Sequence, residues 1–260
     1  MSTILHRAPP FRAEQVGSFL RPDELLEVRR AWEDKKASDQ DLREAEDKAV
    51  NEVVKLQQDY GFHGINDGEY RRHMFWGSFW PNLEGMKEIV GPDPEIFRRY
   101  VPDVGAFLEV SRRLSIIVGA HSPVVQKNHK PGETVICEGK IKHVPAASKG
   151  HIEQLQYLQK IIPEAHHGDI KLTIPAPTWY HLRYKQGFAY PASAYKNDDE
   201  YFADVVKTFQ TELQVLYDHG LRNVQIDDPN ICCKAFLIQE AYKTLTKSFR
   251  FLQQQDDRGL

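Results

Sequence analysis

Apolar residues recur at helical spacing in several long stretches of the chain. The clearest stretch is 198–219, where one face carries Phe202, Val205, Val206, Phe209, Leu213 and Leu216. Range 39–60 shows the same spacing after Ser38, a residue type that favours helix N-caps. The pattern therefore predicts amphipathic helices at 39–60 and 198–219. It also predicts a helix beginning at Pro22 and others at 107–118, 149–162 and 235–252.

Short, mostly apolar runs separate these helices. Such runs occupy 62–66, 134–143, 170–174 and 223–226, with a weaker run at 11–16. Strands that alternate with helices favour parallel βα units, and we interpret 67–130 as an excursion between two strands. The predicted fold class is α/β: a TIM (β/α)8-type barrel that is incomplete, with about five of its eight βα units. A doubly wound open sheet stays possible, although no Gly-x-Gly-x-x-Gly motif opens the first helix.

Composition narrows the protein class. The chain has 260 residues, of which 41% are hydrophobic and 27% charged, and its net charge is −3. This balance is typical of a globular protein and gives no general attraction to nucleic acid. No run approaches the roughly 20 apolar residues that span a membrane, and three cysteines cannot build a disulfide framework. We expect a cytoplasmic protein with a flexible arm at 1–10 and one barrel-like domain at 11–260.

Polar and turn-forming motifs follow four of the predicted strands. These motifs are Gly17-Ser18, Asp67-Gly-Glu69, Pro175-Ala-Pro177 and Asp227-Asp-Pro229. The carboxyl ends of the strands carry the active site in barrel enzymes, so the motifs mark the candidate site. Simpler interpretations exist for some members. Glu69 suits a surface ion pair with Arg71 or Arg72, Ser18 suits a turn, and Asp227 or Asp228 suits a helix cap.

Three segments together resemble the catalytic domain of cobalamin-independent methionine synthase. They are Phe11-Arg-Ala-Glu-Gln-Val-Gly-Ser-Phe-Leu-Arg-Pro22, Gly64-Ile-Asn-Asp-Gly-Glu-Tyr-Arg-Arg72 and Val224-Gln-Ile-Asp-Asp-Pro229. A looser match is Lys171-Leu-Thr-Ile-Pro-Ala-Pro177, and the resemblance runs from about residue 11 to 231. A related uroporphyrinogen decarboxylase-type barrel is a weaker alternative.

The resemblance implies methyl transfer from 5-methyltetrahydrofolate, in its polyglutamate form, to the thiol of homocysteine. Small molecules are then the expected partners, with no nucleic acid and no membrane. Carried onto this sequence, the family's substrate-binding positions are Val16, Gly17, Ser18, Glu69 and Asp227. Gly17 permits close backbone approach and Ser18 offers donors, while two carboxylates suit one cationic group. Another thiol alkyltransferase of the same barrel family is an alternative.

The resemblance also implies zinc, which family members bind through a His-x-Cys pair, a Glu and a later Cys. This sequence has no His-x-Cys and no histidine after His219. Neither Cys232-Cys233 nor His166-His167 replaces that set, because a tetrahedral site needs more ligands than adjacent residues supply. We therefore expect the zinc ligands to be absent from a chain truncated at its C-terminal side. An inactive fragment or a small-molecule binder is the corresponding alternative function.

Several aromatic residues could line a pocket or fill a core. Trp179 and Tyr180 follow the Pro-Ala-Pro turn, near the position where the family stacks its folate ring. Core packing suits these two residues equally well. Four further aromatics lie within six residues, and we interpret them as burying a long loop. They are Phe75, Trp76, Phe79 and Trp80.

Overall fold

The computed structural model describes residues 14–72, 74–77, 79–90, 92–98 and 134–228. The chain divides into two compact units. Described residues of the first unit come from 14–79, 148–175 and 214–227, and those of the second from 80–147, 176–213 and residue 228.

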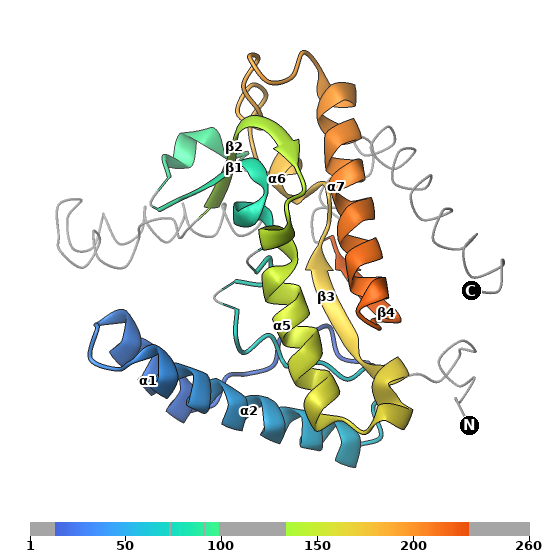
Figure 1. The fold of residues 1–260 in the computed structure, drawn as a ribbon. Helices are drawn as coiled ribbons and strands as arrows, with labels where there is room; N and C mark the ends of the chain where they lie inside the picture. Colours follow the sequence, from blue (N-terminus) through green and yellow to red (C-terminus); the bar gives the residue numbers. More distant parts are fainter. Residues whose placement is uncertain (1–13, 73, 78, 91, 99–133, 229–260) are drawn as a thin grey trace, which may run out of the picture. The chain divides into compact units, whose positions relative to one another are not determined.

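Two helices open the first unit (Figure 1). Helix α1 spans Asp23–Glu33 after Pro22, and α2 spans Asp39–Asp59. The predicted N-cap of α2 is confirmed, because the Ser38 hydroxyl accepts a hydrogen bond from Asp41 N at 3.1 Å. The Asp41 carboxylate in turn accepts one from Ser38 N at 2.8 Å, which completes a capping box. The chain leaves the helix at Gly61, whose φ is 71°.

A parallel pair of strands positions the polar residues of the first unit. Strand β3 spans Lys171–Pro175 and β4 spans Asn223–Asp227, in the register Thr173↔Gln225. Ile65 adds one parallel bridge to Ile170. Side chains alternate along a strand, so Lys171, Thr173, Gln225 and Asp227 share one face of the pair. The opposite face carries Leu172, Ile174, Val224 and Ile226.

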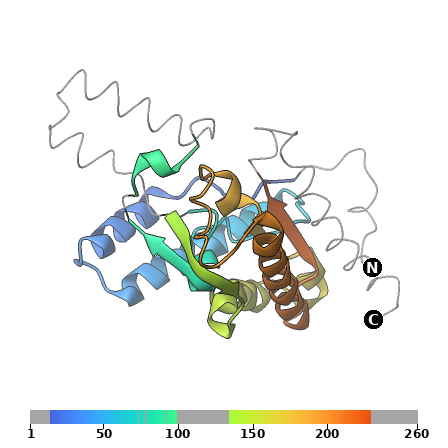
Figure 2. The ribbon, with the colours of Figure 1, turned by 90° about the horizontal axis from the view of Figure 1, so that it is seen from above.

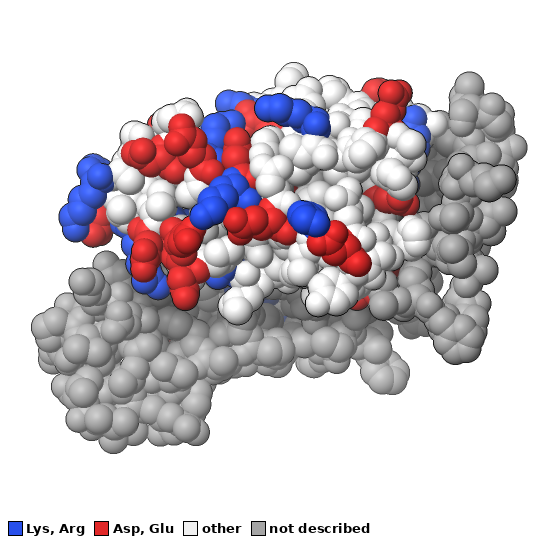
Figure 3. Space-filling model, turned by 90° about the horizontal axis from the view of Figure 1, so that it is seen from below, with Lys and Arg blue, Asp and Glu red and all other residues white. Residues whose placement is uncertain are grey.

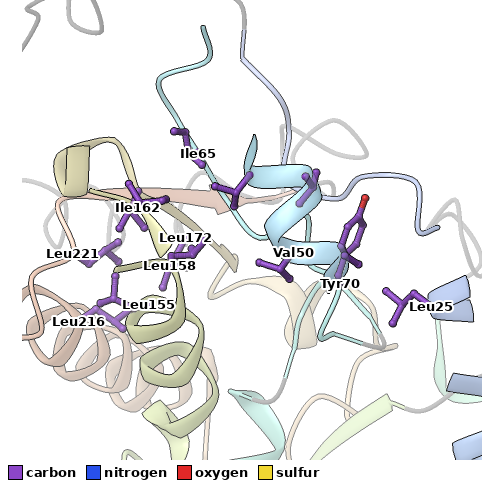
Figure 4. Close-up of a cluster of buried hydrophobic side chains, with 14 residues drawn as sticks. Leu25, Val50, Ile65, Tyr70, Leu155, Leu158, Ile162, Leu172, Leu216 and Leu221 are labelled. Carbon is purple, nitrogen blue, oxygen red and sulfur yellow. The ribbon is translucent and has the colours of Figure 1, made fainter. Parts of the chain in front are cut away.

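Apolar side chains from that opposite face help to fill the core of the first unit. Leu172 lies there with residues of α2 and of α5, a helix that spans Pro145–Ile161 and belongs to this unit from 148 onward (Figure 4). The labelled side chains of Figure 4 include Val50, Leu155 and Leu158, each 0% exposed. Burial of one such side chain stabilises the fold by roughly 1.5–3 kcal/mol. The core thereby fixes the polar face of β3 and β4 on its other side.

The second unit is built on an antiparallel ribbon. Strand β1 spans Glu84–Ile89 and pairs with β2, Thr134–Lys142, as Figures 1 and 2 show. The other elements of the unit are η2 (Trp80–Asn82), η3 (Pro94–Ile96), the short α6 (Trp179–Leu182) and most of α7 (Asp198–Asp218). Trp80 packs edge-on against Tyr180, with ring centroids 5.1 Å apart. Helix η4, Glu164–Asp169, belongs to the first unit.

Several sequence expectations need correction. Residues 14–16 form no strand, and 62–66 contribute only the bridge at Ile65. The strand expected at 134–143 exists, but its partner is β1, which was not predicted, and the pairing is antiparallel. A periodic pattern identifies a strand but not its partner, which explains this miss. The incomplete barrel is not confirmed, because the described part of the chain shows two two-stranded sheets. The arm at 1–10 and the helices expected at 107–118 and 235–252 lie outside the described residues.

The surface carries both signs of charge. Figure 3 shows one face, on which acidic and basic side chains lie interspersed. Exposed ion pairs such as Lys55–Asp59, 2.7 Å apart on α2, contribute to this mixture. Among the helices of the described ranges, none is long and apolar enough to cross a membrane.

Candidate functional site

The segment 15–18 is held against the loop that follows α2. The buried Asn66 amide donates to the backbone carbonyl of Gly17 at 3.0 Å and to Gln15 Oε1 at 3.2 Å. Gln57 of α2 accepts from Asn66 N at 3.1 Å, which ties the same loop to the helix. These bonds fix the backbone of Gly17 although segment 14–18 belongs to no helix or strand.

Gly17 lies where a side chain would not fit. Its φ is +130°, a conformation that residues with a Cβ rarely adopt. A Cβ there would lie 2.8 Å from Thr173 Cγ2 and 2.9 Å from Glu69 Oε1. The glycine therefore lets the backbone approach the Glu69 carboxylate, while its role toward a substrate stays a prediction.

Glu69 has an unusual backbone conformation for a residue that is not glycine. Its φ is 59°, in the left-handed region. Two hydrogen bonds hold it there: Glu69 N donates to Asp67 Oδ1 at 2.9 Å, and Arg21 donates to Glu69 O at 3.0 Å. Strained backbone of this kind persists where its surroundings enforce it, and it is frequent at functional sites.

The carboxylate of Glu69 is buried and receives hydrogen bonds on both oxygens. Thr173 Oγ1 donates to Oε1 at 2.5 Å, and the Ser18 hydroxyl donates to Oε2. Arg72 Nη1 lies 3.5 Å from Oε1, and the exposed fractions of the Arg72 and Glu69 side chains are 3% and 2%. Arg72 also donates to Thr173 Oγ1 at 3.0 Å and to Gln154 Oε1 at 2.8 Å. The ion pair with Arg72 exists, but it is buried rather than on the surface.

Asp227 supplies the second carboxylate at the end of β4. Its Oδ1 accepts from Gln225 Nε2 at 2.6 Å, and the same nitrogen donates to Val16 O at 2.5 Å. Burial raises the pKa of Asp227 above its ordinary value, and the negative charge of Glu69 raises that pKa further. Hydrogen bonding from Gln225 and the charges of Arg72 and Lys171 act in the opposite direction. A cation placed near both carboxylates would relieve their repulsion.

All five positions expected from the resemblance lie in the first unit. Direct contacts join Ser18 to Glu69 and place Gly17 beside it, while Gln225 links Val16 to Asp227. In the second unit, Asp228 accepts a hydrogen bond from Thr178 at 3.1 Å. Sequence reasoning did not assign roles to Arg72, Thr173, Gln225 or Lys171. The alternation of polar and apolar residues in Lys171-Leu-Thr-Ile-Pro175 was the signal that could have placed Thr173 on the site face.

The other candidates are a group of aromatic side chains and one polar segment. Trp76, Phe79, Trp80, Trp179 and Tyr180 are each at most 5% exposed, as expected for core aromatics, whereas Phe75 is only half-buried. The polar segment Glu138-Gly-Lys140 lies within β2, which continues to Lys142.

The described residues do not fit a zinc site. Within ranges 14–98 and 134–228, apart from their gaps, no three His, Cys, Asp or Glu side chains form a group that could hold a metal ion. Cys137 is buried, and burial raises the pKa of its thiol to about 11, which disfavours the thiolate that binds zinc. His166 lies 3.3 Å from Asp169 on η4. Cys232 and Cys233 lie outside the described residues.

Comparison with known proteins gives distant relatives. No family model matches the chain. Uncharacterized protein YxjG of Bacillus subtilis (strain 168) is 26% identical over 227 residues, which are 87% of this chain and 50% of the relative. A methionine synthase of Sulfolobus acidocaldarius is 24% identical over 239 residues, 90% of this chain and 56% of the relative. The chain thus spans about half the length of the curated relatives that it matches.

Comparison with solved structures shows a similarity in fold. The structure of a putative vitamin-B12 independent methionine synthase from Listeria monocytogenes superposes with a TM-score of 0.55 and 22% identity. The match covers 84% of this chain and 52% of that chain. The chain is thus similar in fold to a putative vitamin-B12 independent methionine synthase and distantly similar in sequence to a methionine synthase. The Glu69 and Asp227 carboxylates with segment 16–18 form the candidate functional site.

Proposed function

We propose that the chain recognises the α-amino group of homocysteine, the methyl acceptor of methionine synthases. The observation that supports this proposal is that segment 16–18 is tied to both carboxylates: the Ser18 hydroxyl donates to the buried Glu69, and Gln225 joins Val16 O to Asp227. An ammonium group is compact and carries three donors, so it can bridge two carboxylates. Arg72 and the buried Lys171 compensate the two carboxylate charges, so the preference for an ammonium group rests on the acceptor positions that Glu69 and Asp227 offer.

Each member of the site has a place in this proposal. Each carboxylate oxygen has two lone-pair positions, so Glu69 Oε2 can accept the ammonium while it keeps the Ser18 hydroxyl. Asp227 offers Oδ2 in addition to the Oδ1 that binds Gln225. Segment 16–18 supplies backbone N–H donors for the carboxylate of the amino acid, while the Ser18 hydroxyl stays on Glu69.

The wider reaction is proposed from the relatives. In methionine synthases of this class the methyl group comes from 5-methyltetrahydrofolate, and we propose the same donor for a reaction that this site serves. Because the described residues do not fit zinc, no step through a metal is assigned to this chain. We further propose that β3, β4 and the bridge at Ile65 belong to an incomplete (β/α)8 barrel, which the TM-score of 0.55 supports.

Calorimetric titration tests the proposal. L-Homocysteine should bind more tightly than 4-mercaptobutanoate, which has the same thiol and carboxylate but no amino group. Glu69→Gln should reduce this discrimination by about tenfold or more, because a charge-assisted hydrogen bond is lost. Glu27→Gln is the matched control, since Glu27 is an exposed carboxylate on α1. Equal affinities of the wild-type chain for the two ligands would refute the proposal.

A methyl-transfer assay separates the candidate functions. The wild-type chain would be incubated with homocysteine and 5-methyltetrahydrofolate triglutamate, with and without added zinc, and methionine measured. Turnover would identify a methyltransferase. Homocysteine binding without turnover would identify a small-molecule binder, and turnover with other thiols only would identify a different alkyltransferase.

A further inference from the structure

A buried lysine lies behind the Asp227 carboxylate in the first unit. Lys171 is 2% exposed and stands on the site face of β3. Its Nζ donates to Gln225 Oε1 at 2.8 Å and to Gln15 O at 2.7 Å. Desolvation of an ammonium group is costly, so its hydrogen-bond acceptors must be held in place. The parallel register pairs Gln225 with Thr173, which lies two residues beyond Lys171 on the same face of β3.

The lysine determines which way the Gln225 amide faces. An ammonium group can only donate, so the amide oxygen of Gln225 must point toward Lys171. The amide nitrogen is then directed to the opposite side, where it meets Val16 O at 2.5 Å and Asp227 Oδ1 at 2.6 Å. If the amide were flipped, its oxygen would face the Asp227 carboxylate and the Val16 carbonyl, which are both acceptors.

We propose that Lys171 and Gln225 are positioning residues that orient Asp227 for the amino group of the substrate. Gln225 occupies Oδ1 of Asp227, so Oδ2 is presented to the ligand. The same amide nitrogen binds Val16 O, so the carboxylate and segment 16–18 are held in one arrangement. Lys171 acts through Gln225 and needs no contact with the substrate. This inference rests on the proposed recognition of homocysteine.

The test is a double-mutant cycle on ligand discrimination. The measured quantity is the ratio of the Kd for 4-mercaptobutanoate to the Kd for L-homocysteine. We expect Lys171→Met and Gln225→Leu each to lower the ratio by about three- to tenfold, as one hydrogen bond to a charged group is lost or misdirected. In the Gln225→Leu background, Lys171→Met should have little further effect, because residues that act through one another are not additive. Lys160→Met, at an exposed position of α5, is the matched control and should leave the ratio unchanged.

The outcomes separate the two proposals. A purely structural role would weaken both ligands equally and leave the ratio unchanged, and that result would overturn the positioning role. A wild-type ratio near one would instead refute the amino-group site itself. Additive effects in the cycle would show that Lys171 does not act through Gln225. If Lys171→Met does not fold, Gln225→Leu alone tests the positioning role, and an unchanged ratio in that variant overturns it.

Discussion

The guanidinium of Arg72 lies 3.5 Å from Oε1 of Glu69, and both side chains are almost fully buried. Removal of one partner of a buried ion pair leaves an uncompensated charge, which costs about 3–5 kcal/mol. Arg72 also donates to Thr173 and Gln154, so its loss leaves further acceptors unpaired. Arg72→Met should therefore lower the free energy of unfolding by roughly that amount, measured by urea denaturation.

An exposed ion pair provides the control for this measurement. Lys55 and Asp59 lie 2.7 Å apart on α2, with side-chain exposures of 71% and 58%. Lys55→Met should change stability by at most about 0.5 kcal/mol. The double variant Arg72→Met/Glu69→Gln should recover part of the loss, because the unpaired negative charge is gone. A loss for Arg72→Met as small as that for Lys55→Met would contradict the buried pair.

Gly17→Ala should weaken both folding and ligand binding. The new methyl group would meet Thr173 Cγ2 at 2.8 Å and Glu69 Oε1 at 2.9 Å, in a backbone conformation that alanine disfavours. We expect a loss of about 2 kcal/mol or more in thermal unfolding, and weaker homocysteine binding in calorimetry.

Two other glycines allow the cost of backbone strain to be measured apart from the cost of the steric clash. Gly61 also has positive φ, but no atom lies within 4 Å of the position that an added methyl group would take, and Gly168 has neither constraint. Gly61→Ala should cost about 1 kcal/mol, from backbone strain alone. Gly168→Ala should be nearly neutral. Equal losses of stability in Gly17→Ala and Gly61→Ala would show that the close approach to Glu69 does not contribute to the cost at position 17.

Local patterns predicted the long helices of the described ranges well, because their signals lie within the elements. Ser38 begins α2 as its residue type suggested, and α7 spans Asp198–Asp218 against the predicted 198–219. The strand ends of β3 and β4 were also placed within one residue. The pairing of β2 with β1 could not be predicted in this way, because pairing depends on residues about 50 positions apart.

Prediction of the site had a similar limit. Motif resemblance selected Glu69 and Asp227, but it said nothing of Arg72 or Thr173, whose hydrogen bonds surround Glu69. These contacts join residues about 100 positions apart, and only the fold brings them together. The left-handed backbone at Glu69 was equally invisible, because glutamate rarely adopts that conformation and no local pattern indicates it.

Binding of homocysteine should release protons at pH values near the raised pKa of Asp227. Burial and the charge of Glu69 raise the pKa of Asp227, and a bound ammonium would lower it again. Between the two pKa values, binding must expel a proton, so affinity should fall as the pH falls through the raised pKa. Calorimetry in two buffers of different ionisation enthalpy measures this release, and Asp227→Asn should abolish it. Unchanged proton release in Asp227→Asn would assign the effect to another group.

The raised pKa of Asp227 also determines whether the unfolding free energy rises or falls with pH. Because the folded-state pKa of Asp227 is raised, the unfolded chain loses this proton at lower pH than the folded chain does. The unfolding free energy should therefore fall as the pH rises from the ordinary carboxyl range through the raised pKa. Asp227→Asn should remove this part of the pH dependence, measured by urea denaturation across that window. If the difference in unfolding free energy between the wild type and Asp227→Asn stayed constant with pH, it would contradict the raised pKa of Asp227.

Cys137 should resist alkylation while the second unit is folded. Its thiol is buried and 7% exposed, and burial raises its pKa to about 11. Near pH 8 only about one thiol in a thousand would then be ionised, against roughly a quarter of ordinary cysteines, and the thiolate is the reactive form. Iodoacetamide should therefore label Cys137 at least about a hundredfold more slowly in the native chain than in concentrated guanidinium chloride. Mass spectrometry of the peptide containing Cys137 measures both rates without interference from the other cysteines. Rapid native labelling at this position would show that β2 opens readily to solvent. The Tyr195 hydroxyl accepts a hydrogen bond from Ile141 N on β2 at 2.6 Å. Tyr195→Ala should therefore raise the rate at which Cys137 is labelled in the native chain.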